Sequence, residues 1–182
     1  EEQEAFEGEM LRFKGAWSSS NQGPRAKKNG DKEDGKKFKV EKTWNKNPQL
    51  RVWMRDPEDK DVEYDSVGLQ IVVSTPIEGA ELGMHVMRNT FCQFYNEKIE
   101  VLAERYQKLV AKTDSHVEES EIAMDIVLDN DFEVKKNGCE RGFPFFIVPS
   151  LMDKKQDGPM QVLIYSDKPI AVQMLADEDR KL

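Results

Sequence analysis

The chain has 182 residues, of which 38% are hydrophobic and 34% are charged, and its formal net charge is -8 at pH 7. This length suits one domain with a modest core, and the negative charge argues against a nucleic-acid-binding protein, which needs a basic face. No run of about 18 apolar residues occurs, so no transmembrane segment is predicted. Two cysteines without CxxC spacing predict neither a disulfide framework nor a zinc site, and they indicate free thiols in a reducing cytoplasm.

Short segments with alternating or continuous apolar residues, separated by turn-rich stretches, predict an antiparallel β-sandwich of about eight strands. Leu50, Val52 and Met54, for example, alternate with more polar neighbours, as in a half-buried strand. The predicted strands are residues 10–14, 50–55, 68–75, 82–87, 122–129, 145–148, 160–165 and 170–175.

The first long loop, residues 18–39, is rich in lysine and has no apolar period, so it is predicted to be a mobile basic loop. A basic patch of this kind can bind acidic phospholipid headgroups or a protein partner. A solvated loop that binds nothing is the alternative. The candidate binding residues are Lys27, Lys28, Lys36, Lys37 and Lys39.

The second long loop, between residues 56 and 65, is acidic. Calcium takes six to eight oxygen ligands, which clustered carboxylates on a flexible loop can supply. Three interpretations stay open: a calcium site, a docking site for a basic protein partner, and a solvated loop without a ligand. The candidate residues are Asp56, Glu58, Asp59, Asp61, Glu63 and Asp65.

Residues 94–110 carry apolar side chains at four-three-four-three spacing, which predicts an amphipathic helix inside an insertion that spans 92–118. Its apolar stripe either packs on the same chain or contacts a partner. The residues of this stripe are Tyr95, Ile99, Leu102, Tyr106 and Leu109.

Catalytic residues are not apparent in the chain. Phe91 and Gln93 flank Cys92, and Cys139 follows a turn glycine, so neither cysteine has the surroundings of a protease nucleophile. His85 lies in a predicted strand and His116 in an acidic loop. We therefore expect no peptidase activity from this chain by itself.

Several short motifs occur in an order that resembles the third domain of calpain cysteine proteases. Gly15 and Trp17 match the end of that domain's first strand, Trp44 and Asn47-Pro48-Gln49 match the segment before its second, and Phe146 to Leu151 match its later Pro-Ser motif. The closing motif matches Tyr165-Ser166-Asp167-Lys168. The family's Ala-Gly-Gly-Cys is replaced by Ser18 to Gly23, so the resemblance is to a divergent calpain or calpain-like protein.

This resemblance implies a C2-like β-sandwich that regulates a protease and does not cleave peptides. In calpains the matching acidic loop contacts basic residues of the catalytic core and responds to calcium and phospholipid. The chain opens on Glu1 and not on Met, which we interpret as a fragment of a longer polypeptide. The resemblance implies that this polypeptide is a calpain-type cysteine protease or a catalytically inactive relative, with a catalytic domain besides this chain. The expected partner is that catalytic domain, in the cytoplasm, at a membrane or at the cytoskeleton. The alternative is a calcium-independent interaction module of a scaffold or cytoskeletal assembly.

Overall fold

A computed structural model describes residues 8–17, 47–89, 107–129, 144–153 and 155–175. These residues form strands and connecting loops, and within them no helix has the length and apolar character needed to cross a membrane. The five lysines of the predicted basic loop lie outside the described residues, as do both cysteines and four residues of the predicted helix, namely Tyr95, Ile99, Leu102 and Tyr106.

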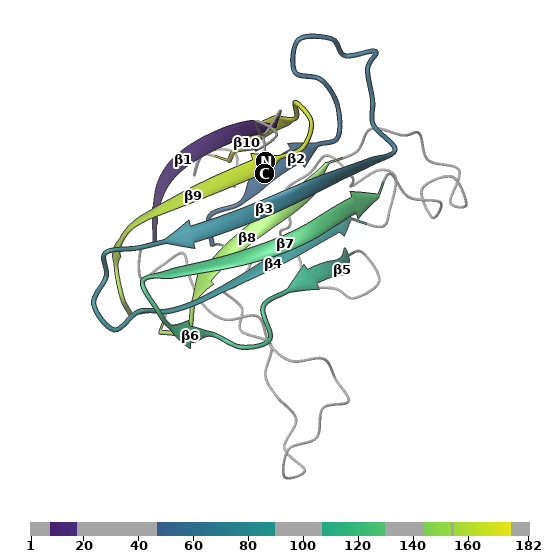
Figure 1. Ribbon diagram of the computed structural model, residues 1–182. Coiled ribbons are helices and arrows are strands. Elements are labelled where there is room, and N and C mark those ends of the chain that lie inside the picture. The colour runs from purple at the N-terminus through teal and green to yellow at the C-terminus, as the bar shows by residue number, and fades with distance from the viewer. Residues whose placement is uncertain (1–7, 18–46, 90–106, 130–143, 154, 176–182) are drawn as a thin grey trace, which may run out of the picture.

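Two antiparallel sheets face each other (Figure 1). The four-stranded sheet has the order β1-β9-β3-β7, and the six-stranded sheet has the order β10-β2-β8-β4-β5, with β6 also paired to β4. The strands of the first sheet are β1 (Glu9–Trp17), β9 (Gly158–Ser166), β3 (Ser66–Ser74) and β7 (Glu121–Asp129). Those of the second are β10 (Ala171–Met174), β2 (Leu50–Trp53), β8 (Phe145–Leu151), β4 (Glu81–Asn89), β5 (Gln107–Lys112) and β6 (Val117–Glu118).

The pairing of the strands is nested. The first strand pairs with the ninth, β2 with β8, β3 with β7, and β4 with β5. Early strands therefore pair with late strands as in one long antiparallel ribbon. Successive pairs along this ribbon belong alternately to the four-stranded and the six-stranded sheet. This is the jelly-roll form of a double-sheet β architecture.

The prediction of an all-β antiparallel sandwich is confirmed, and each of the eight predicted strands overlaps an observed one. The predicted helix over 94–110 is wrong in the part that the structure describes, because residues 107–112 form β5. The end of the predicted insertion also holds a strand, because residues 117–118 form β6. Leu109 therefore lies on a strand that pairs with β4, beside a bulge between Val86 and Met87. Backbone hydrogen bonding to the edge of β4 stabilises this segment as a strand more than its apolar spacing stabilises it as a helix.

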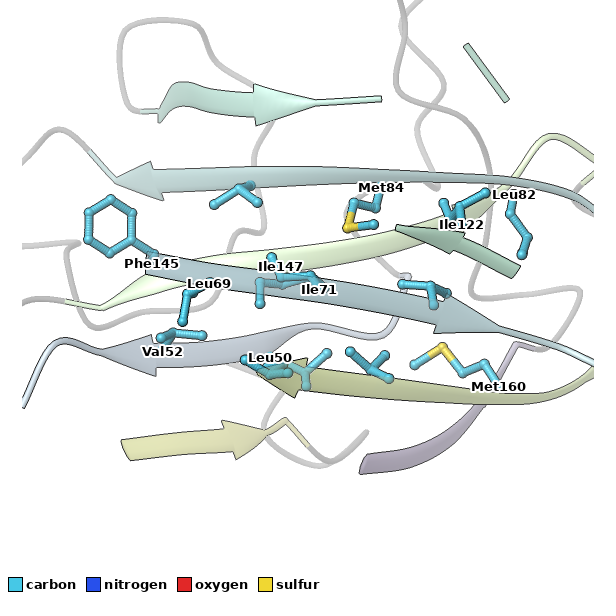
Figure 2. Packing of buried hydrophobic residues seen from close by; sticks show 14 of the residues in the cluster. Leu50, Val52, Leu69, Ile71, Leu82, Met84, Ile122, Phe145, Ile147 and Met160 are labelled. Atoms are coloured by element: carbon cyan, nitrogen blue, oxygen red, sulfur yellow. The ribbon is translucent and has the colours of Figure 1, made fainter. Parts of the chain in front are cut away.

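The main core lies between the sheets (Figure 2). Ile71 of one sheet and Leu50 and Ile147 of the other are fully or almost fully buried. Each such side chain stabilises the fold by roughly 1.5–3 kcal/mol relative to an exposed one. The indole of Trp17 also crosses between the layers, and its Nε1 donates a hydrogen bond to the Pro149 carbonyl at 3.4 Å.

A second buried cluster contains Met87, Phe146, Val148 and Leu175. Phe146 alternates along β8 with Phe145 and Ile147, which belong to the main core, so the second cluster lies on the other face of the same sheet. Every residue of β8 is buried. This two-sided burial explains why the sequence of β8 is a continuous apolar run and not an alternating one.

Candidate functional site

The acidic loop connects β2 to β3 and projects beyond one end of the sandwich (Figure 1). All six of its predicted carboxylates lie within the described residues. Residues 57–63 and Asp65 are exposed, and Asp56 at the base is half-buried. The loop therefore presents most of its negative charge to solvent.

Local hydrogen bonds give this loop a defined shape. Asp56 Oδ1 accepts a hydrogen bond from the Glu58 amide at 2.8 Å, and Asp59 Oδ1 accepts one from the Asp61 amide at 3.0 Å. Both are Asx turns, in which a short acidic side chain replaces a backbone acceptor. Two aspartates thus organise the backbone in addition to carrying charge.

Backbone hydrogen bonds close the base of the acidic loop. The Asp56 amide donates to the Val62 carbonyl at 2.9 Å, and the Tyr64 amide donates to the Met54 carbonyl at 2.9 Å. Arg55 and Glu63 form an isolated antiparallel bridge between these two contacts. The acidic loop is therefore a small hairpin that extends β2 and β3 beyond the sheets.

The six carboxylates do not assemble into a metal cage. Among the residues that the structure describes, no three His, Cys, Asp or Glu side chains come together in a way that could hold a metal ion. Closeness along the chain therefore does not by itself bring three of these carboxylates into a metal-binding group.

Cationic and aromatic side chains surround the base of the acidic loop. The guanidinium groups of Arg51 and Arg55 each lie 5.3 Å from the ring centroid of Trp53, within the range of a cation–π contact. The Lys168 ammonium lies 5.5 Å from the Tyr64 ring and donates a hydrogen bond to the Ser66 carbonyl. Burial, followed by the nearby carboxylates of Asp56 and Glu9, raises the pKa of the Tyr64 phenol above its ordinary value.

A histidine–serine pair lies elsewhere, where the segment between β5 and β6 crosses β4 and β8. His116 Nε2 is 2.9 Å from Ser150 Oγ, and burial lowers the pKa of His116 below its ordinary value. Ser150 is 0% exposed, so a substrate cannot reach it. The pair ties a loop to the sheet and is not a catalytic dyad.

His116 lies in a predicted acidic loop, and one local signal in the sequence indicates a close packing contact. Gly83 pairs with Ser150 in the middle of the sheet, and a Cβ atom at Gly83 would lie within 3.0 Å of three atoms of the His116 ring. A glycine inside a strand often marks such a close approach. The identity of the approaching group could not be read from the sequence.

The motifs that resemble calpains occupy specific structural positions. Trp17 bridges the two layers, as described above, and Asn47 and Gln49 are 0% exposed at the start of β2. The Gln49 carbonyl accepts a hydrogen bond from the Leu175 amide at 2.9 Å. Ser166 Oγ donates to the Lys168 carbonyl at 2.6 Å and so shapes the turn after β9. The described residues of these motifs therefore help to hold the sandwich together.

Comparisons with known proteins identify no family for this chain. No family model and no curated protein matches it. Among solved structures, a chain in the cryo-EM structure of broad bean stain virus has 9% identity and a TM-score of 0.32, covering 93% of this chain and 84% of that chain. A chain from heated full particles of Israeli acute paralysis virus has 8% identity and the same TM-score, 0.32, covering 92% of this chain and 74% of that chain. A TM-score of 0.32 is too low for either likeness to indicate a shared function.

Proposed function

We propose that this chain is a non-catalytic regulatory module of a calpain-type protein, and that its acidic loop docks onto a basic protein surface. The observation that carries the proposal is the hairpin that forms the acidic loop, in which residues 57–63 and Asp65 are exposed and no three carboxylates group into a metal-binding set. The expected partner is the catalytic domain of the same polypeptide. The ordered motif series from Trp17 to Lys168 supports the calpain-type assignment, because Trp17, Asn47, Gln49 and Ser166 are buried in the sandwich; Trp44 lies outside the described residues.

Electrostatic docking of this kind increases the association rate and the selectivity for the partner more than it increases the binding affinity. An exposed ion pair contributes about 0.2–1 kcal/mol, so several carboxylates acting together are needed for a useful contact. Screening acts over about 8 Å at physiological ionic strength, so the interaction weakens as salt is added. The two Asx turns reduce the ordering cost on binding, because the hairpin already holds its shape in the free chain.

A calcium-independent interaction module is the second candidate. The scattered positions of the loop carboxylates favour it over an ion sensor, since within the described residues no acidic group of three or more could hold a metal. Calcium binding remains a separate hypothesis, and it has a separate test. An ion that binds the folded chain must raise its melting temperature.

The docking test removes charge while keeping the side-chain shapes. The variant Glu58→Gln/Asp61→Asn/Glu63→Gln neutralises three exposed carboxylates of the acidic loop. A twelve-residue peptide of alternating lysine and glycine is the probe, and its dissociation constant is measured by biolayer interferometry in 50 and 150 mM salt. We expect the variant to bind about tenfold more weakly than the unaltered chain in 50 mM salt, with a smaller difference at the higher salt.

The matched control neutralises three exposed carboxylates at the opposite end of the sandwich, in Glu118→Gln/Glu119→Gln/Glu121→Gln. Equal binding by the loop variant and the control would show that net charge alone attracts the peptide, and the docking proposal would fail. The calcium arm compares thermal melting in millimolar calcium with melting in millimolar magnesium. A rise specific to calcium that is lost in Asp59→Asn/Asp61→Asn would assign the loop to ion binding instead.

A further inference from the structure

The outer face of the four-stranded sheet carries a shallow hollow of about 730 Å³. It lies over β3, between β9 on one side and β7 on the other, on the face turned away from the core. This sheet forms one layer of the sandwich in Figure 1. The residues that give the hollow its chemistry are Gly68, Gln70, Asp125, Val127, Tyr165 and Asp167.

The strand register places these residues in two neighbouring rows across the sheet. Gly68 is opposite Val127, and Gln70 is opposite both Asp125 and Tyr165. Directly opposed residues of an antiparallel pair point to the same face. The two rows therefore share the outer surface and are separated by about 6.8 Å, which is two residues along a strand.

The first row is hollow because of a glycine and an aspartate that pack against each other. The Gly68 amide donates to Asp167 Oδ1 at 3.1 Å, and the Asp167 amide donates to the Gly68 carbonyl at 3.1 Å. A Cβ atom at Gly68 would lie 3.2 Å from Asp167 Oδ2, so glycine leaves room for the carboxylate. Asp167 is exposed, so its charge is held in place at the surface of the sheet.

The second row holds another carboxylate in place. Gln70 Nε2 donates a hydrogen bond to Asp125 Oδ1 at 3.1 Å, and both residues are exposed. The phenol ring of Tyr165, which is half-buried, lies on the opposite side of Gln70. This row therefore combines a fixed negative charge with an aromatic face, which attracts cations through its ring quadrupole.

The hollow also exposes apolar surface. Val127 is 63% exposed, the largest value among the large hydrophobic side chains that the structure describes. Met10 of β1, which is 48% exposed, does not line the hollow but is paired with Tyr165, which does. Apolar surface rimmed by polar groups is typical of an interaction site.

We infer that this hollow binds an extended peptide segment of a partner protein in which lysine or arginine alternates with small apolar residues on one face. The eight residues that line the hollow include two aspartates and no lysine or arginine, so the complementary ligand is cationic. Side chains two apart in an extended segment repeat every 6.8 Å or so, which matches the spacing of the two rows. A second copy of this acidic chain is disfavoured as the occupant, because like charges repel.

This site goes beyond the proposed function, since none of its residues belongs to the acidic loop of residues 56–65. Either site can therefore fail without the other. Both would face a basic partner, and Ser66 and Gly68 at the start of β3 place the hollow next to the base of the acidic loop. A partner that covers both regions would contact the two aspartates of the hollow and the exposed carboxylates of the acidic loop together.

The test uses an acetylated and amidated peptide, Thr-Arg-Thr-Val-Thr-Arg-Thr-Val, whose Arg and Val side chains share a face when the peptide is extended. Nuclear magnetic resonance titration of the ¹⁵N-labelled chain locates the contact. We expect saturable shift changes in the amides of Gly68, Gln70, Val127 and Asp167. The same peptide with Glu in place of Arg is the ligand control and should cause no saturable change there.

The variant Asp125→Asn/Asp167→Asn removes both charges and keeps an amide oxygen as acceptor for each hydrogen bond. We expect it to bind the arginine peptide about five- to twentyfold more weakly, as for the loss of two exposed ion pairs. The control Asp114→Asn/Asp153→Asn removes two charges near the opposite end of the sandwich and should bind as the unaltered chain does.

Three results would overturn the inference. The first is unchanged affinity in Asp125→Asn/Asp167→Asn. The second is a set of shift changes confined to residues 56–65, which would leave the acidic loop as the docking site and remove the hollow. The third is a change of self-association in the Asp125→Asn/Asp167→Asn variant, measured by sedimentation velocity, which would make the occupant a second copy of the chain.

Discussion

Replacing Gly83 by alanine tests whether the close approach of His116 explains a glycine in the middle of a buried strand. The added Cβ would lie 2.7 Å from Nε2, 2.8 Å from Cδ2 and 3.0 Å from Cε1 of the His116 ring. Carbon atoms do not sit that close to a ring, so the imidazole must move. Because Nε2 is only 2.9 Å from Ser150 Oγ, the movement breaks that contact.

The expected cost follows from three terms. Overpacking costs typically 1–3 kcal/mol, and leaving the buried Ser150 hydroxyl without its partner costs about 1–3 kcal/mol. Gly83 has an ordinary backbone conformation, so alanine also stabilises the chain by about 0.4–1 kcal/mol through the unfolded state. Since the ring can relax part of the clash, we expect a net loss of about 1–3 kcal/mol in the free energy of unfolding.

Urea unfolding followed by tryptophan fluorescence measures this loss, and a double-mutant cycle identifies its cause. In a His116→Ala background the ring is gone, so Gly83→Ala should become neutral or slightly stabilising. The coupling free energy between the two positions should therefore be about 1–4 kcal/mol. If Gly83→Ala costs the same in both backgrounds, the ring does not explain the glycine, and the reasoning fails.

Two further predictions concern the same sandwich. Burial lowers the pKa of His116, so as the pH falls the unfolded chain binds a proton at this histidine before the folded chain does. The free energy of unfolding should therefore decrease as the pH drops below about 6.5. His116→Gln should reduce this decrease, as measured by urea titrations between about pH 5 and 8. A variant that loses stability as steeply as the unaltered chain would contradict this. Trp17→Phe removes the hydrogen bond to the Pro149 carbonyl and leaves a small cavity, so it should lower the free energy of unfolding by about 1–3 kcal/mol, whereas Trp53→Phe, at a half-buried position, should cost less.

The sequence predicts most of the strands because their burial has a period that the residues reveal. Leu50 and Val52 alternate with Arg51 and Trp53, and the structure buries the first two and leaves the second two half-exposed. The prediction from the sequence fails at residues 107–112, where Leu109 fits the spacing of a helical apolar stripe that begins at Tyr95. The partner that decides the outcome there is the edge of β4, which is distant in sequence, so a local pattern could not reveal it.

Of the two candidate sites, the sequence reveals one and does not reveal the other. The acidic loop is visible in the sequence, because its carboxylates are consecutive or nearly so, but their failure to converge depends on the hairpin that Asp56 and Asp59 shape. The hollow over β3 is invisible in the sequence, since its charges come from Asp125 on β7 and from Asp167 in the turn after β9, which are far apart along the chain. Only the register of the sheet brings such residues together.

The nested pairing of the strands has a consequence for how the chain folds as it is made. The Glu9 carboxylate accepts a hydrogen bond from the Ile170 amide, 161 positions later, and β1 is paired along its whole length with β9. A ribosome must therefore complete nearly the entire domain before the earliest strand finds its neighbour. Folds dominated by such distant contacts form slowly, in milliseconds to seconds, and until then the apolar side of β1 is exposed to chaperones and to aggregation.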